Sequence, residues 1–87
     1  MDRASILQSL TELLREVLGN DDLVATDDLS AKHVAGWDSL KNILLFVEIE
    51  RAFAVKFTAA EMAGLRNVGE LATLLEKKIH GRRPGST

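Results

Sequence analysis

Cysteine is absent from this chain, proline occurs once, and no long apolar run is present. Without cysteine, disulfides, a thiolate nucleophile and cysteine-based metal sites are excluded. His33 and His80 lie far apart and have no partner at metal-ligand spacing, so we predict no metal site. No segment resembles a secretory signal or reaches the length of a transmembrane helix. We therefore expect a cytoplasmic protein with no transmembrane segment.

Charge is distributed unevenly along the 87 residues. Residues 1–38 carry eight acidic and three basic side chains, a balance of −5, residues 39–70 balance at zero, and residues 71–87 carry +3. The basic end has no interleaved aromatic residue, so a solvated helix end explains it better than nucleic-acid binding. The acidic first segment also disfavours a helix-turn-helix protein. We expect no nucleic-acid partner.

Apolar residues at spacings of three and four predict an amphipathic helix over residues 5–18, and Gly19 supplies its stop. The residues of this face are Ile6, Leu7, Leu10, Leu13, Leu14, Val17 and Leu18. Residues 20–38 predict a long ordered loop, since its apolar residues are too irregular for a helix but can anchor the segment. These anchors are Leu23, Val24, Leu29 and Val34.

A second helix is expected over residues 39–53, with Asp38 or Ser39 as its N-cap. Its apolar residues cover more than one face. One set can point into a core: Leu45, Phe46, Ile49 and Phe53. Another set points elsewhere: Leu40, Leu44 and Val47. Either a partner covers this second face, or the first and third helices straddle the second helix and bury it.

Two further helix starts follow. Thr58 and Glu61 have capping-box spacing and predict a short helix ending near Gly64. Asn67 and Glu70 repeat the signal for a last helix. The expected core face of that helix is Val68, Leu71, Leu75 and Ile79, with Leu74 beside it. The predicted fold is all-α: a four-helix bundle with a long loop between helices 1 and 2 and a short helix 3.

The motif at residues 36–40 places a hydroxyl at the start of the second helix. Ser39 is either an ordinary N-cap or the carrier of a phosphate ester, because a helix N-terminus favours anions. Over residues 5–79 the chain resembles an acyl or peptidyl carrier protein. The resemblance is carried by Gly36-Trp37-Asp38-Ser39-Leu40, Leu29, the Glu50 to Phe53 step and Val68-Gly69-Glu70-Leu71.

This resemblance implies that a phosphopantetheinyl transferase attaches a 4'-phosphopantetheine arm from coenzyme A to Ser39. Acyl or related intermediates would ride on the arm as thioesters, and Asp38 would help to seat the transferase's metal or cap the helix. The chain would have no catalytic residue of its own and would be a monomer that meets acyl-loading and acyl-consuming enzymes. Residues 1–80 would form the acyl-carrier-like domain and residues 81–87 a flexible basic tail. The alternative is a small helical protein–protein interaction module without a prosthetic group.

The second helix departs from the pattern of carriers in fatty-acid synthesis, which is generally acidic and meets basic patches on enzymes. Lys41 follows the motif and Arg51 interrupts the acidic residues, so attraction to a basic patch is weakened. We therefore expect a specialised stand-alone carrier in lipid biosynthesis or secondary metabolism, docked by dedicated enzymes. The expected docking residues are Leu40, Leu44 and Val47, with Lys41, Glu48 and Arg51 at the rim.

Two side-chain roles follow from the same pattern. Trp37 is expected to pack against the loop, since a lone tryptophan more often serves burial than recognition. Phe46, Ile49 and Leu75 either line a space for an acyl chain or form plain core.

Overall fold

The computed structural model describes residues 2–81 and contains only helices and connecting segments in that range. The elements are α1 (Arg3–Leu18), the short 3-10 helix η1 (Ala31–His33), α2 (Ser39–Phe53), α3 (Ala59–Gly64) and α4 (Val68–Gly81). The all-α fold, the long first connection and the short α3 agree with the prediction. The helix η1 was not predicted, because three residues are too few to show a periodicity. Of the expected tail, Gly81 is the last residue of α4, and the rest lies outside the described residues.

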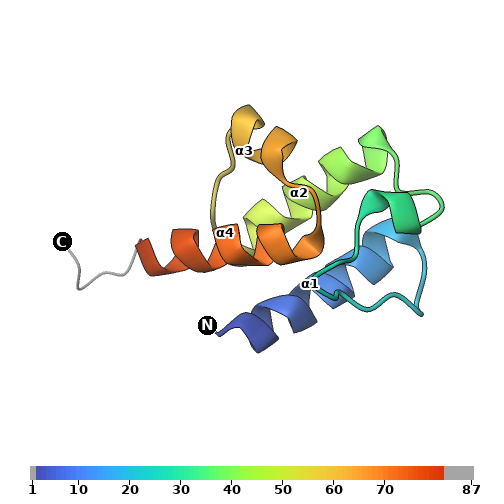
Figure 1. The fold of residues 1–87 in the computed structure, drawn as a ribbon, viewed down its shortest axis with the longest axis horizontal. Helices are drawn as coiled ribbons and strands as arrows, with labels where there is room; N and C mark the ends of the chain where they lie inside the picture. Colours follow the sequence, from blue (N-terminus) through green and yellow to red (C-terminus); the bar gives the residue numbers. More distant parts are fainter. Residues whose placement is uncertain (1, 82–87) are drawn as a thin grey trace.

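Helix α1 lies against both α2 and α4, and the long loop returns beside α1 to reach the start of α2 (Figure 1). Helix α3 lies on the side of the molecule away from α1 in this view. This arrangement leaves one face of α2 without a neighbouring helix.

Local sequence sets the ends of α1 and α3. The Asp2 carboxylate accepts a hydrogen bond of 2.8 Å from the Ser5 N–H, so α1 begins two residues before the predicted start. Gly19, with φ of 65°, ends the helix in the left-handed conformation that glycine adopts without strain. Thr58 and Glu61 form the predicted capping box, with bonds of 3.1 and 2.9 Å in the two directions.

The start of α4 follows its predicted signal only in part. The Asn67 side chain accepts a bond of 2.9 Å from the Glu70 N–H, as an N-cap does. The Glu70 carboxylate, however, accepts from the N–H of Arg66 at 2.8 Å rather than from Asn67. The reciprocal bond therefore lies one residue before its usual place.

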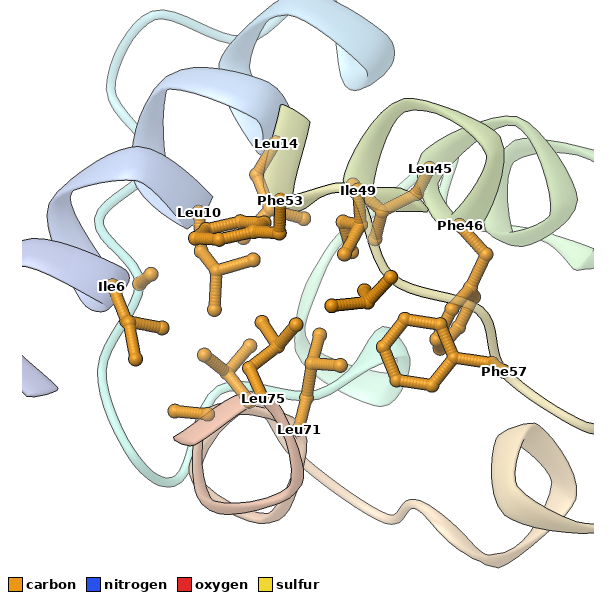
Figure 2. Close-up of a cluster of buried hydrophobic side chains, with 14 of the residues drawn as sticks. Ile6, Leu10, Leu14, Leu45, Phe46, Ile49, Phe53, Phe57, Leu71 and Leu75 are labelled. Carbon is orange, nitrogen blue, oxygen red and sulfur yellow. The ribbon is translucent and has the colours of Figure 1, made fainter. Parts of the chain in front are cut away.

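The core lies between the inward faces of α1, α2 and α4 (Figure 2). All four α2 residues predicted to point inward are buried, and Ile6, Leu10, Leu14 and Leu75 are almost fully enclosed around them. Burial of one such side chain contributes roughly 1.5–3 kcal/mol. Ile79, which was predicted to be a core residue of α4, is only partly buried at the edge of the cluster.

The long loop is anchored as predicted by Leu23 and Val34, which are buried, and by Leu29, which packs on the core. The prediction for Val24 was wrong, since its side chain is 54% exposed. Neighbouring side chains of an extended segment point to opposite sides, so Val24 faces outward once Leu23 and Ala25 face inward. The Ala25 N–H donates to the Thr11 hydroxyl at 2.8 Å and fixes this register.

The same loop covers the N-terminus of α4. The Val68 N–H donates to the Leu29 carbonyl and the Gly69 N–H to the Asp27 carbonyl, both at 2.8 Å. The first N–H groups of a helix have no partner within the helix, and both of these residues are buried. The loop thus satisfies donors that would otherwise be enclosed without an acceptor.

Arg3 joins three elements beside this contact. Its guanidinium donates to the Asp27 and Glu76 carboxylates at 3.0 and 2.8 Å, and to the Gly69 carbonyl and the Thr73 hydroxyl at 3.0 Å each. The hydrogen bonds with Glu76 and Asp27 raise the pKa of Arg3 above its usual value. One permanently charged side chain of α1 therefore links the loop to α4.

The contact between loop and helix predicts that Gly69→Ala destabilises the fold. An added Cβ would lie 2.8 Å from the Asp27 carbonyl oxygen, which belongs to the backbone and cannot rotate away. We expect a loss of about 1–3 kcal/mol in the free energy of unfolding, more than the gain of up to about 1 kcal/mol from the helix propensity of alanine. Urea titration of the two variants measures this loss. Gly64→Ala is the matched control, because nothing lies within 4 Å of a Cβ at that position. Equal stability of the two variants would contradict this account of the contact.

Candidate functional site

Ser39 is the first residue of α2, and Asp38 before it is the N-cap. The Asp38 backbone is extended, with φ of −103°, and its carboxylate accepts a bond of 2.9 Å from the Lys41 N–H. Its carbonyl accepts from the Asn42 N–H at 2.9 Å. The Ser39 side chain is exposed, and within residues 2–81 its hydroxyl takes part in no hydrogen bond. Ser39 therefore does not cap the helix.

The residues before Asp38 form the turn that delivers the chain to α2. The Trp37 N–H donates to the Val34 carbonyl at 3.3 Å, and Gly36 within this turn has φ of 86°. Residues with a Cβ rarely adopt that conformation, which explains the glycine at this position of the motif. Val34 is buried, so the turn is fixed to the core at one end and to the cap of α2 at the other.

A cavity of about 370 Å³ opens beside Ser39. One part of its lining is polar: Ser30, Asp38, Ser39, Asn42, Arg66 and Asn67. The rest is apolar: Ala31, Trp37, Leu45, Phe46, Met62, Leu65, Val68 and Leu71. The sequence left open whether Phe46, Ile49 and Leu75 line such a space. Phe46 does, whereas Ile49 and Leu75 are fully buried core residues.

Trp37 forms one wall of this cavity. Its ring is partly buried and packs on the core, so it serves burial as predicted, and its indole N–H donates to the Asn42 side-chain oxygen at 3.1 Å. This bond links the turn before α2 to the first turn of the helix. The side chain of Asn42 is thereby fixed on the cavity side of α2, one helical turn beyond Ser39.

Aromatic and charged contacts hold α3 near α4, where Met62 and Leu65 line the same cavity. The Phe46 and Phe57 rings meet edge to face with centroids 5.1 Å apart, as Figure 2 shows from the side of the core. The Lys78 ammonium lies 5.2 Å from the Phe57 ring centroid and pairs with the Glu61 carboxylate at 2.9 Å. The pKa of Glu61 is lowered first by the hydrogen bond from the Thr58 N–H and second by the hydrogen bond from the Lys78 ammonium.

The second face of α2 is exposed. Leu40, Leu44 and Val47 are 63%, 44% and 45% exposed, so the possibility that α1 and α3 straddle α2 and bury this face is wrong. Ile43 is exposed beside them and was missed, although its spacing from Leu40 and Val47 places it on the same stripe. We call these four residues the α2 face.

The charged residues expected at the rim lie around the α2 face. Arg51 pairs with Glu48 at 3.6 Å, so their charges offset one another. Lys41 is partly exposed, and within residues 2–81 it forms no ion pair. Lys41 therefore adds a positive charge to the rim near Ser39, not far in sequence from the exposed Asp38, and the rim at the far end is close to neutral.

The site combines an exposed serine, a helix N-terminus and a cavity. An exposed hydroxyl that is released from capping stands at the positive end of a helix beside a cavity with a polar mouth. Across residues 2–81 we find no helix long and apolar enough to cross a membrane, and no cluster of three or more potential metal ligands. The fold and the site thus define a small helical domain with an exposed serine at the start of α2.

Comparison with known proteins identifies the family. The protein-family model described as the phosphopantetheine attachment site matches residues 8–75. The acyl carrier protein of Thermotoga maritima is 29% identical over 77 residues, which cover 88% of this chain and 95% of that protein. A meromycolate extension acyl carrier protein of Mycobacterium leprae is 31% identical over 72 residues, which cover 83% of this chain and 63% of that protein.

Solved structures of acyl carrier proteins have the same fold as this chain. A holo acyl carrier protein from Geobacter metallireducens superposes with a TM-score of 0.83 and 38% identity over 87% of each chain. The Thermotoga maritima acyl carrier protein gives a TM-score of 0.81 with 25% identity, covering 95% of this chain and 96% of that one. The chain belongs to the phosphopantetheine-binding acyl carrier protein family. It is a carrier rather than an enzyme, and its cofactor is a covalently attached 4'-phosphopantetheine.

The division of roles between Asp38 and Ser39 is open to measurement. Asp38→Ala removes the cap and should lower the free energy of unfolding by roughly 0.5–2 kcal/mol. Ser39→Ala removes a hydroxyl without a protein partner and should change it by less than about 0.5 kcal/mol. Chemical denaturation of the unmodified protein compares the two. A larger loss for Ser39→Ala than for Asp38→Ala would mean that the serine is the structural residue.

Proposed function

We propose that Ser39 is the attachment point of the 4'-phosphopantetheine arm, and that the chain presents acyl or related thioesters to dedicated biosynthetic enzymes. The observation that carries the proposal is the capping of α2 by Asp38, which leaves the Ser39 hydroxyl exposed and unengaged. When bound, the arm supplies the thiol that holds the acyl group. The chain has no cysteine and therefore no thiol of its own.

The residues around Ser39 fit a phosphate ester. The N-terminus of α2 favours an anion by about 0.3–1 kcal/mol. The Lys41 N–H is already bound to Asp38, so Asp38 orders the first turn while the helix dipole still acts on Ser39. We assign Asp38 a second role in the encounter with the transferase, where its exposed carboxylate is available to the metal of that enzyme.

Family membership implies a transferase and acyl-handling enzymes as partners. It favours the carrier over an interaction module without a prosthetic group. We further propose that the acyl-carrier-like domain spans residues 1–80 and acts as a monomer in the cytoplasm. These points stay predictions.

We propose that dedicated enzymes dock on the α2 face, with Lys41, Glu48 and Arg51 at the rim. Four exposed apolar side chains follow Ser39 on one face of α2, and an exposed apolar patch of this kind on a small domain is typical of an interaction site. Because Glu48 and Arg51 offset each other, a basic enzyme surface would meet no net acidic field here and would be repelled by Lys41. This charge distribution supports partners other than those of general fatty-acid synthesis.

Mass spectrometry tests the attachment site. Incubation with coenzyme A and a promiscuous phosphopantetheinyl transferase should add roughly 340 Da, the mass of the arm. Ser39→Ala should abolish the gain. Ser30→Ala is the matched control, because Ser30 lines the same cavity and should leave the gain intact. Modification of Ser39→Ala would refute the assignment.

Enzyme kinetics test the proposed docking. A general fatty-acid ketosynthase should use the acylated protein with a kcat/KM at least about tenfold below that for the housekeeping carrier, a difference of roughly 1.4 kcal/mol. Lys41→Glu should recover part of this loss. Lys77→Glu makes the same charge change at an exposed position on α4 and should recover none. Turnover of the unaltered protein equal to that of the housekeeping carrier would rule out specialised docking.

A further inference from the structure

The three asparagines of the chain share one arrangement: the side-chain oxygen of each is held by a group that can only donate. Asn42 accepts from the Trp37 indole N–H at 3.1 Å and Asn67 from the Glu70 N–H at 2.9 Å. Asn20 accepts from the Asp22 N–H at 3.0 Å. Because indole and backbone N–H groups cannot accept, the oxygen of each amide must face them. The amide nitrogens therefore point the other way.

Two of these asparagines line the cavity beside Ser39, and Asn20 does not. Asn42 comes from α2 and Asn67 from the start of α4, so they reach the cavity from different elements. Both side chains are partly buried, and within residues 2–81 neither amide nitrogen donates a hydrogen bond. Two amides that line the cavity thus have a fixed oxygen and N–H groups that are accessible to solvent, with no protein partner in this range.

The chemistry of the lining indicates what these donors bind. Beyond them the wall is apolar, with Leu45, Phe46 and Leu71. A carbonyl oxygen that enters such a space loses water and needs a donor in its place. Asn42 lies three residues after Ser39 on the same side of α2, within reach of a group attached there.

We propose that Asn42 and Asn67 are positioning residues that donate hydrogen bonds to carbonyl oxygens of the Ser39-linked group when it folds into the cavity. The inference rests on the proposed attachment at Ser39. The carbonyl belongs either to an amide of the arm or to the thioester of the cargo. Trp37 acts through Asn42, because its indole N–H fixes the orientation of that amide.

Side-chain amide signals in ¹⁵N NMR spectra test this directly, since the chain has only three asparagines and one glutamine. The unmodified protein is compared with protein loaded from coenzyme A and with protein loaded from octanoyl-coenzyme A. The Asn42 and Asn67 NH₂ signals should shift while those of Asn20 stay in place. A shift in the free-thiol form assigns the carbonyl to the arm, and a shift only in the octanoyl form assigns it to the thioester.

Replacement by aspartate separates the two functions of each amide. Asn42→Asp keeps an acceptor for the Trp37 indole and removes the free donors, and Asn67→Asp does the same at the start of α4. Where the thioester carbonyl is the acceptor, loss of the donor should release the thioester from the cavity to the solvent. Its cleavage by hydroxylamine should then become roughly two- to tenfold faster in either variant, the worth of one hydrogen bond. Asn20→Asp adds the same charge away from the cavity and should leave the rate unchanged.

The outcomes separate this inference from the proposed function. Loading, seen as the mass gain, with unchanged Asn42 and Asn67 signals would overturn the inference and leave the attachment site intact. Where the signals shift only in the octanoyl form, equal cleavage rates in Asn42→Asp, Asn67→Asp and Asn20→Asp would overturn it as well. Failure of the unaltered protein to gain mass would overturn both.

Discussion

The hydrogen bonds from the N–H groups of Val68 and Gly69 to the carbonyls of Leu29 and Asp27 are the constraint on which the site depends. They satisfy the buried start of α4 and at the same time fix the middle of a long loop. The residues that follow, Ser30 and Ala31, then form part of the cavity lining. The room for this contact comes from Gly69, where a side chain would meet the loop backbone.

At the start of α2, one residue caps the helix and the next carries the exposed hydroxyl. Asp38 supplies the cap, and the helix start remains ordered whether or not the next hydroxyl is modified. A serine that capped the helix would lose its structural bond on becoming an ester. With Asp38 in that role, a hydroxyl can be exposed at the positive end of the helix without weakening it.

Features encoded by a few neighbouring residues could be predicted from the sequence. The start of α2, the capping box of α3 and the stop at Gly19 depend on side chains within one turn, and the structure has them. Features that depend on distant contacts could not. The outward position of Val24 follows from packing of its neighbours, and the cavity follows from where α3 sits relative to α4. The exposure of the α2 face could likewise not be predicted, because it depends on where α1 and α3 lie.

The two faces of α2 place different demands on the same helix. The inward face is fixed by the core, so the outward residues near Ser39 can differ without cost to the fold. A neutral rim gives weak attraction at long range, and recognition must then come from contacts made at short distance. Apolar contact distinguishes partners by shape, whereas an uncompensated Lys41 rejects positively charged surfaces. If enzymes dock on the α2 face as we propose, this face selects partners mainly by excluding unsuitable ones after encounter, rather than by drawing suitable ones from a distance.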